Sequence, residues 1–210
     1  MDSLALKVRN LNENVELQHL FGSSDETRGP ENDRIRQRHQ NPTAKCTFGK
    51  RSPNWPNLSF SKLGLTIERI ENATKDSKWC IVTCTKDYLL AEMALKTSMR
   101  TGNFQDHLRL YPYHVNTLIQ MADLLTTQED YTMAADIYKR IFYVYETITP
   151  SGLSLLGSNS SGILSKGQIS LDYCYRLNRG IFIALFHWIQ LLCRRSCFKT
   201  ALEYCKILLR

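Results

Sequence analysis

Hydrophobic and polar positions across residues 111–145 follow the 3.6-residue period of two successive helices. In the first half, apolar residues recur at offsets of three and four, while polar residues occupy the opposite face. The apolar set is Val115, Leu118, Ile119, Ala122 and Leu125. We predict an amphipathic helix with Pro112 in its first turn, where the missing N–H has no intrahelical partner to lose.

The second half of this stretch predicts a helix that runs back along the first. The link at residues 126–130 is short, so the two helices are expected to be antiparallel. Glu129 and Asp130 fall where a helix N-terminus favours negative charge. Small residues at contact positions allow close approach and aromatic residues fill space, as in the 34-residue tetratricopeptide repeat. The predicted repeat core consists of Leu118, Ala122, Leu125, Ala134, Tyr138 and Ile141, with Ala201 and Cys205 as counterparts in a second unit.

Weaker patterns predict the elements on either side of this pair. A short helix is expected near residues 13–21, ended by Gly22, and a strand or hairpin from residues 63–70 and 79–84. Residues 86–100 have helical spacing with Gly102 as a stop signal, and residues 150–170 are rich in Ser and Gly, typical of a flexible loop. Asn178 is a predicted N-cap for an apolar helix at 180–193 that is buried on more than one side, and a last helix follows a turn at 194–197.

These elements predict an all-α fold, a tetratricopeptide-like α-solenoid that follows an extended, partly disordered basic arm. The arm is expected at residues 1–60 and the repeat domain at 61–210, including the flexible loop at 150–170. The chain stops at Arg210 inside a helical pattern that lacks a glycine or proline stop signal, and a repeat helix of that kind expects a neighbour. We therefore expect the repeat domain to be truncated, with the chain a piece of a longer protein, a truncated gene product or a natural short form.

The arm carries the charge pattern most relevant to function. Residues 23–56 contain few large aliphatic side chains and more basic than acidic ones. One hypothesis is contact with RNA phosphates; the other is a solvated linker. Trp55 nearby would either stack on a base or pin the arm to the domain. The candidate RNA contacts are Arg34, Arg36, Arg38, Lys45, Lys50 and Arg51.

Composition narrows the class of protein. The net charge of +7 suits an anionic partner, and seven cysteines, an odd number placed mostly in apolar helical patterns, indicate a reducing compartment. Residues 1–9 mix charges, so we predict no secretion signal. The most apolar run, residues 181–193, is short for a bilayer and contains His187 and Gln190, so we predict no membrane partner.

Candidate chemistry is sparse. The sequence lacks a P-loop, a GxGxxG turn, an HExxH helix and a GxSxG elbow. The Cys80-x3-Cys84 and Cys193-x3-Cys197 spacings lack the CxxC knuckles or paired histidines of a metal site. His114 stands at a helix start, where a capping or packing role is expected. We predict no catalytic residue, no metal and no cofactor.

Several short segments resemble the transcription factor 25 family, which includes subunit 1 of the ribosome quality control complex. The resemblance is carried by the run from Tyr111 to Val115 with Leu118, by Gln128-Glu129-Asp130 and by Met133-Ala134. It extends in the family's order over nearly the whole chain, to Arg9-Asn10-Leu11-Asn12, Glu16-Leu17, Phe21-Gly22, Lys45-Cys46-Thr47, Trp55-Pro56, Leu171-Asp172-Tyr173 and residues 200–206. The loop at 150–170 departs from the family as an insertion, and the family's charged N-terminal and helical C-terminal regions are not present.

The resemblance implies a non-enzymatic adaptor in the cytoplasm. Members of the family act on stalled large ribosomal subunits beside the listerin-type ubiquitin ligase and other quality-control subunits, where they favour degradation-type ubiquitin linkages. Two alternatives stay open: a nuclear, nucleic-acid-associated transcriptional regulator, and a truncated product without full activity.

Overall fold

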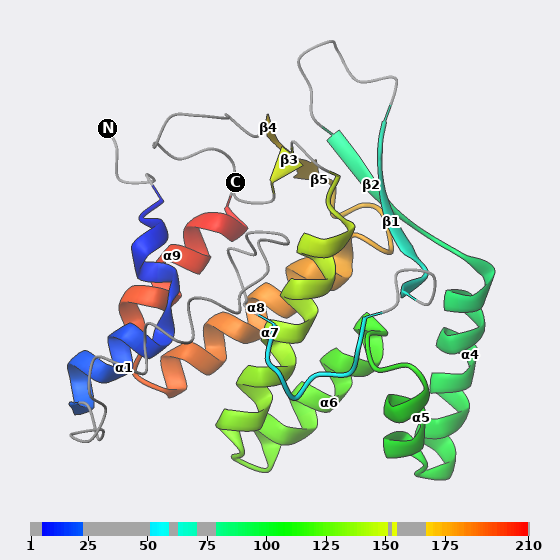
Figure 1. The fold of residues 1–210 in the computed structure, drawn as a ribbon, viewed down its shortest axis with the longest axis horizontal. Helices are drawn as coiled ribbons and strands as arrows, with labels where there is room; N and C mark the ends of the chain where they lie inside the picture. Colours follow the sequence, from blue (N-terminus) through cyan, green and yellow to red (C-terminus); the bar gives the residue numbers. More distant parts are fainter. Residues whose placement is uncertain are drawn as a thin grey trace.

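The chain is mostly helical, with helices arranged side by side and a small sheet at one end (Figure 1). The computed structural model describes residues 6–22, 51–58, 63–70, 79–150, 153–154 and 167–209. Residues 23–50, which hold most of the predicted basic arm, lie outside these ranges.

The predicted helix pair is present as α6, Val115–Thr127, and α7, Tyr131–Ile148. Their packing faces are those expected from the apolar period. The predicted start of the first helix was wrong, because Pro112 lies in a turn and α6 begins only at Val115. His114 is the N-cap, and its side chain accepts a hydrogen bond from the Thr117 N–H. Asp130 caps α7 through the Met133 N–H.

Helix α4, Lys86–Thr101, begins at the Thr85 cap and ends at Gly102, whose φ of 77° is left-handed. The sequence pattern predicted both boundaries. It did not predict the next helix, α5, Phe104–Leu110. Seven residues span only about two turns, too few for an apolar period to be recognised.

A second helix pair follows as α8, Arg179–Arg194, and α9, Phe198–Leu208. Its connecting turn has the backbone geometry of the α6–α7 turn: Ser196 and Glu129 both have a φ of 62°. The Cys197 N–H donates to the Leu192 carbonyl at 2.9 Å, and the Asp130 N–H donates to the Leu125 carbonyl at 3.0 Å. In both pairs, the chain therefore reverses direction between the two helices through the same kind of turn.

Helices α6, α7 and α9 pack against α8. The sequence predicted that α8 is buried on more than one side. It did not predict the exposed strip of α8, in which Ile183 and Phe186 face outward. At its start, α8 lies so close to α7 that a Cβ on Gly180 would stand 2.5 Å from the Tyr145 hydroxyl oxygen. Within the described ranges, no helix combines the length and apolar character needed to cross a membrane.

The small sheet modifies the predicted all-α class. Strands β1, Leu65–Arg69, and β2, Trp79–Cys84, pair antiparallel with Leu65 opposite Cys84, which confirms the expected hairpin-like pairing. β5, Ser170–Leu171, adds to the other edge of β2 in parallel. A separate two-stranded pair joins β3, Leu153–Ser154, to β4, Gly167–Gln168. These short strands occupy parts of the predicted 150–170 loop, and the rest of that loop lies almost wholly outside the described ranges.

Asn178 extends the sheet instead of capping α8. It precedes α8 as predicted, but its side chain makes no cap hydrogen bond. Its Oδ1 accepts from the Val82 N–H at 2.8 Å, and its Nδ2 donates to the Cys80 and Asp172 carbonyls at 3.4 and 2.9 Å. The fully buried amide thus forms hydrogen bonds with backbone groups of β2 beyond the end of β5. Because its polar atoms are used there, the side chain does not cap α8.

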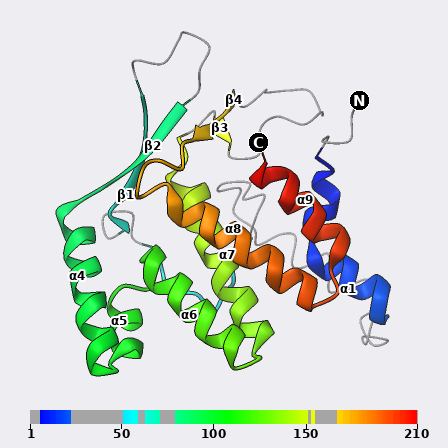
Figure 2. The same ribbon diagram turned by 180° about the vertical axis from the view of Figure 1, so that it is seen from behind.

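The N-terminal segment lies beside the last helix. It contains the 3-10 turn η1, Val8–Leu11, and α1, Glu13–Phe21, and α1 ends at Gly22 as predicted. Both elements pack along α9, as Figure 2 shows from behind. Leu6 and Leu11 are buried there. The last helix therefore has a neighbour from the opposite end of the described chain.

Candidate functional site

The predicted repeat-core residues lie between helices. The side chains of seven are buried, and Cys205 is half-buried on α9. The buried seven are Leu118, Ala122, Leu125, Ala134, Tyr138, Ile141 and Ala201. Because they fill contacts between helices, they support the shape of the molecule and do not form a surface that a partner could touch.

Asp123 joins three helices at the edge of this core. The Tyr138 hydroxyl donates to Asp123 Oδ1 at 3.0 Å, and His187 Nδ1 lies 2.7 Å from the same oxygen. Burial and the adjacent carboxylate both raise the pKa of Tyr138, so the phenol stays protonated as a donor. Asp123 therefore ties α6 to α7 and α8.

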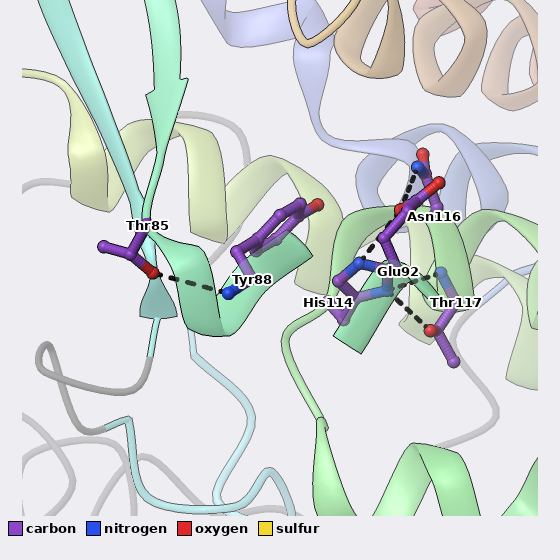
Figure 3. Close-up of polar contacts among 6 residues, drawn as sticks. All are labelled: Thr85, Tyr88, Glu92, His114, Asn116 and Thr117. Carbon is purple, nitrogen blue, oxygen red and sulfur yellow. Dashed lines mark hydrogen bonds and ion pairs between the residues drawn. The ribbon is translucent and has the colours of Figure 1, made fainter. Parts of the chain in front are cut away.

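A group of polar side chains fills the junction between α4 and α6 (Figure 3). We call it the polar junction; it consists of Tyr88, Glu92, His114, Asn116 and Thr117, while Thr85 lies apart from them and caps α4 through the Tyr88 N–H. Glu92 Oε2 accepts from Asn116 Nδ2 at 2.7 Å and lies 3.2 Å from His114 Nε2. His114 Nδ1 lies 2.7 Å from Thr117 Oγ1. One carboxylate thus holds the start of α6 against α4.

His114 is neutral in this arrangement. Burial lowers its pKa to about 4, although the neighbouring Glu92 carboxylate acts in the opposite direction. Nδ1 accepts from the Thr117 N–H, so the ring proton belongs on Nε2, facing Glu92. Both nitrogens are engaged in structural contacts, which agrees with the capping and packing role expected for this histidine.

A cavity of about 210 Å³ adjoins the polar junction. Glu92 and Asn116 line one part, and Arg176 and Arg179 line another. Arg179 is turned toward the Tyr173 ring, 5.4 Å from its centroid, and donates to the Tyr173 carbonyl. The remaining lining is mostly apolar: Leu65, Tyr88, Val115, Tyr145, Leu177, Gly180 and Ile183.

Trp55 pins its segment to α7, one of the two roles considered for it. Only 3% of its surface is exposed, so its face is not open to a base. Its indole N–H donates to Asp136 Oδ2 at 2.8 Å, while Arg140 stands 5.7 Å over the ring. Tyr143 packs against it with a centroid distance of 5.6 Å.

Among the six candidate RNA contacts, the structure describes only Arg51. Its side chain is exposed and donates to Asn57 Oδ1 at 2.6 Å. The other five, Arg34, Arg36, Arg38, Lys45 and Lys50, lie outside the described ranges.

Sequence reasoning missed the contact between the N-terminal segment and α9. Glu16 accepts hydrogen bonds from the Lys199 and Thr200 N–H groups at 2.9 and 2.8 Å, and from the Thr200 hydroxyl. Partial burial raises the pKa of Glu16, but these hydrogen bonds outweigh it and hold the pKa below its usual value. The residue at the N-cap of α9 is Cys197, whose side chain makes no cap hydrogen bond. A cysteine at a predicted helix start was the available signal that a residue from elsewhere would cap this helix.

The cysteines belong to no candidate metal site in the part of the chain that the structure describes. Cys80 and Cys197 are buried, and burial raises the pKa of both thiols, which opposes thiolate formation. Nowhere in those ranges do three or more His, Cys, Asp or Glu side chains gather as a candidate metal site.

Comparison with known proteins identifies relatives along the chain. The family described as Transcriptional repressor TCF25 matches residues 82–210, which begin in β2 and include α4 to α9. A Homo sapiens protein named Ribosome quality control complex subunit TCF25 is 32% identical over 98% of this chain and 29% of its own length. No solved structure matches.

Two fungal relatives carry different names. Ribosome quality control complex subunit 1 of Schizosaccharomyces pombe is 24% identical over 99% of this chain and 30% of its own length. Probable transcription factor claV of Ampulloclitocybe clavipes is 28% identical over 72% of this chain and 19% of its own length. The chain therefore spans less than a third of the length of these relatives.

Proposed function

The chain belongs to the TCF25 family, and from that premise we propose that it is a non-enzymatic adaptor of the ribosome quality control complex. The observation that carries this proposal is the 32% identity over 98% of the chain to a human protein named as a subunit of that complex. We place its action on stalled large ribosomal subunits in the cytoplasm, where it supports ubiquitination and degradation of nascent chains. The proposed partners are a listerin-type ubiquitin ligase and the other quality-control subunits.

We further propose that residues 61–210 form a tetratricopeptide-like helical repeat, with residues 1–60 as its arm. The two helix pairs and their equivalent turns support this arrangement. Stacked helix pairs present an extended surface whose shape is fixed by the buried contacts beneath it. Such a surface suits an adaptor, since it binds several partners without a reactive centre.

Co-sedimentation with stalled ribosomes tests the adaptor role. Tagged chain is expressed in cells that lack their own family member and carry a reporter that stalls translation. We expect the chain in the fractions of the large subunit, enriched by the stalling reporter over a matched reporter without the stall. Absence from those fractions under both conditions would contradict the proposal.

A second candidate function is that of a nuclear, nucleic-acid-associated transcriptional regulator. It is favoured by the family description as a transcriptional repressor and by the name of the Ampulloclitocybe clavipes relative. Cell fractionation with a chromatin pull-down separates the two functions. A nuclear chain that is retained on DNA and absent from large subunits would favour the regulator.

A further inference from the structure

The outer side of α4 exposes large apolar side chains. Leu89, Leu90 and Met93 are 41%, 55% and 56% exposed, whereas Tyr88, Ala91 and Leu95 on the opposite side are buried. α4 lies at the edge of the molecule, next to α5 and below the β1–β2 pair (Figure 1). This apolar strip therefore faces away from the core that anchors the helix.

Basic residues share that side of the helix. At about 100° per residue, Lys86, Lys96 and Arg100 fall in the same sector of about 120° as the apolar strip. All three are exposed. We call these six residues the α4 face: Lys86, Leu89, Leu90, Met93, Lys96 and Arg100. Its apolar residues lie in the middle of the helix, with basic residues toward both ends.

A hollow of about 400 Å³ continues the α4 face toward the sheet. Leu89 belongs to both features, because it also lines the hollow. The other lining residues come from β2 and from the segment before α8: Ile81, Val82, Cys84, Tyr175, Arg176 and Leu177. Most of this lining is apolar, and the exposed Arg176 adds a further positive charge.

We propose that the α4 face and this hollow form a docking site for an acidic amphipathic helix of a protein partner. Leucine or aromatic side chains of that helix cover Leu89 and Met93, and one of them enters the hollow. Its acidic residues pair with Lys86, Lys96 and Arg100. Charge complementarity selects the acidic sequence, and the exposed apolar area supplies the driving force.

The pattern favours protein over RNA or a membrane. Binding to an RNA backbone would use the positive charges of the α4 face. It would leave the large apolar side chains of Leu89, Leu90 and Met93 exposed to water. In a membrane-surface helix, Lys and Arg lie on the polar face opposite the apolar one, whereas on α4 they share the apolar side. The hollow has the concave form that receives a single bulky side chain, as helix-binding grooves do.

Fluorescence anisotropy with the complete chain tests the site directly. The probe is a labelled synthetic 20-residue helix (about 30 Å long) with a row of leucines along one side and glutamates flanking that row. We expect it to bind, and we expect affinity to fall at least about tenfold for Leu89→Asp/Met93→Asp and for Lys86→Glu/Lys96→Glu/Arg100→Glu. The matched control Leu124→Asp/Met133→Asp alters two apolar residues that are similarly exposed elsewhere.

Further probes decide between the partner classes. The same peptide with lysines in place of glutamates should bind at least about tenfold more weakly. Unchanged binding by both α4-face variants, or equal binding of the two peptides, would overturn the proposal. Stronger binding of a single-stranded RNA or of anionic phosphatidylserine vesicles, abolished in those variants, would overturn it too. Circular dichroism checks that every variant is folded.

This inference extends the proposed adaptor role, which supplies the reason to expect a protein partner. The two fail separately, because the peptide test uses no ribosomes. If the chain bound the acidic helix but did not co-sediment with stalled large subunits, the docking-site proposal would stand and the adaptor proposal would fail.

Discussion

At the scale of single residues, Ala134 and its neighbour Met133 have opposite environments. Ala134 is fully buried on α7, while Met133 on the same helix is 51% exposed. Ala134→Arg would bury an unpaired charge, so we expect the free energy of unfolding to fall by about 3–5 kcal/mol. Urea denaturation followed by circular dichroism measures this loss.

Met133→Arg is the matched control for that substitution. It adds the same charge one residue away, where water solvates it, and we expect a change within about 0.5 kcal/mol. Equal effects from the two substitutions would show that Ala134 does not lie in a helix contact. The buried assignment of this position would then be wrong.

His114 gives the fold a dependence on pH. Its folded-state pKa of about 4 lies below the ordinary 6.5, so the unfolded chain binds a proton more readily. The stability from the neutral ring is therefore complete above about pH 6.5 and is lost as pH falls toward about 4. Lowering the pH from about 7 to about 5 is expected to reduce the free energy of unfolding by about 2 kcal/mol through this group.

His114→Asn isolates that effect, because asparagine keeps an N-cap acceptor without titrating. Urea unfolding at the two pH values should show a smaller pH-dependent loss for this variant than for the unaltered chain. His19→Asn serves as the control, since His19 is exposed on α1. An identical pH dependence in all three proteins would refute the assignment to His114.

At the scale of elements, the N-terminus of α9 is capped by a residue from α1. Glu16 takes up two backbone donors that the local sequence leaves without a side-chain acceptor. We expect Glu16→Ala to lower the free energy of unfolding by about 1–2 kcal/mol, as for loss of an ordinary N-cap. Amide hydrogen exchange should also quicken at Lys199 and Thr200.

Gln18→Ala provides the comparison on the same helix, since Gln18 is exposed. It alters α1 without touching α9, so protection at Lys199 should remain. If both variants released α9 equally, the effect would come from α1 stability in general. The specific cap would then be excluded.

At the scale of the whole molecule, the open question is whether the basic arm contacts RNA. We expect Arg34→Ala/Arg36→Ala/Arg38→Ala to weaken binding to a large-subunit ribosomal RNA fragment. The salt dependence should also become shallower, by about 0.7 in the log–log slope for each single-stranded phosphate that the arm no longer neutralises. Filter binding at several salt concentrations measures both quantities.

The control for the arm removes the same positive charge from folded elements. Arg69, Arg109 and Arg194 are exposed on β1, α5 and α8, and their replacement by alanine changes net charge equally. If both triple variants showed the same reduction in affinity and slope, only overall charge would matter. The arm would then be the solvated linker.

Elements with long apolar periods were predictable, and elements fixed by distant partners were not. The helices α6, α7 and α4 each exceed three turns, so the spacing of their apolar residues was long enough to be recognised as helical. The seven-residue α5 is too short to carry such a signal. Pro112 was placed inside α6 because proline suits a first turn, yet the His114 cap began the helix later.

Among the features relevant to function, the sequence predicted some and missed others. The family signature was visible in order along the chain, and Trp55 had a structural role among its alternatives. The sequence by itself could not show that Glu92 would meet His114, or that Leu89 would line a hollow beside β2. Such pairings depend on how helices are oriented, which the local period leaves undetermined.

By itself, the sequence determined the helix pairs and the family, because periodic burial and ordered signatures are properties of the chain. Only the tertiary structure decided that Asn178 completes a sheet, that residues 6–22 cover α9, and that the α4 face stays exposed. Each of these outcomes joins segments far apart in sequence. The physical reason is that a donor or an apolar side chain is satisfied by whichever group packing brings near, and packing is a property of the whole fold.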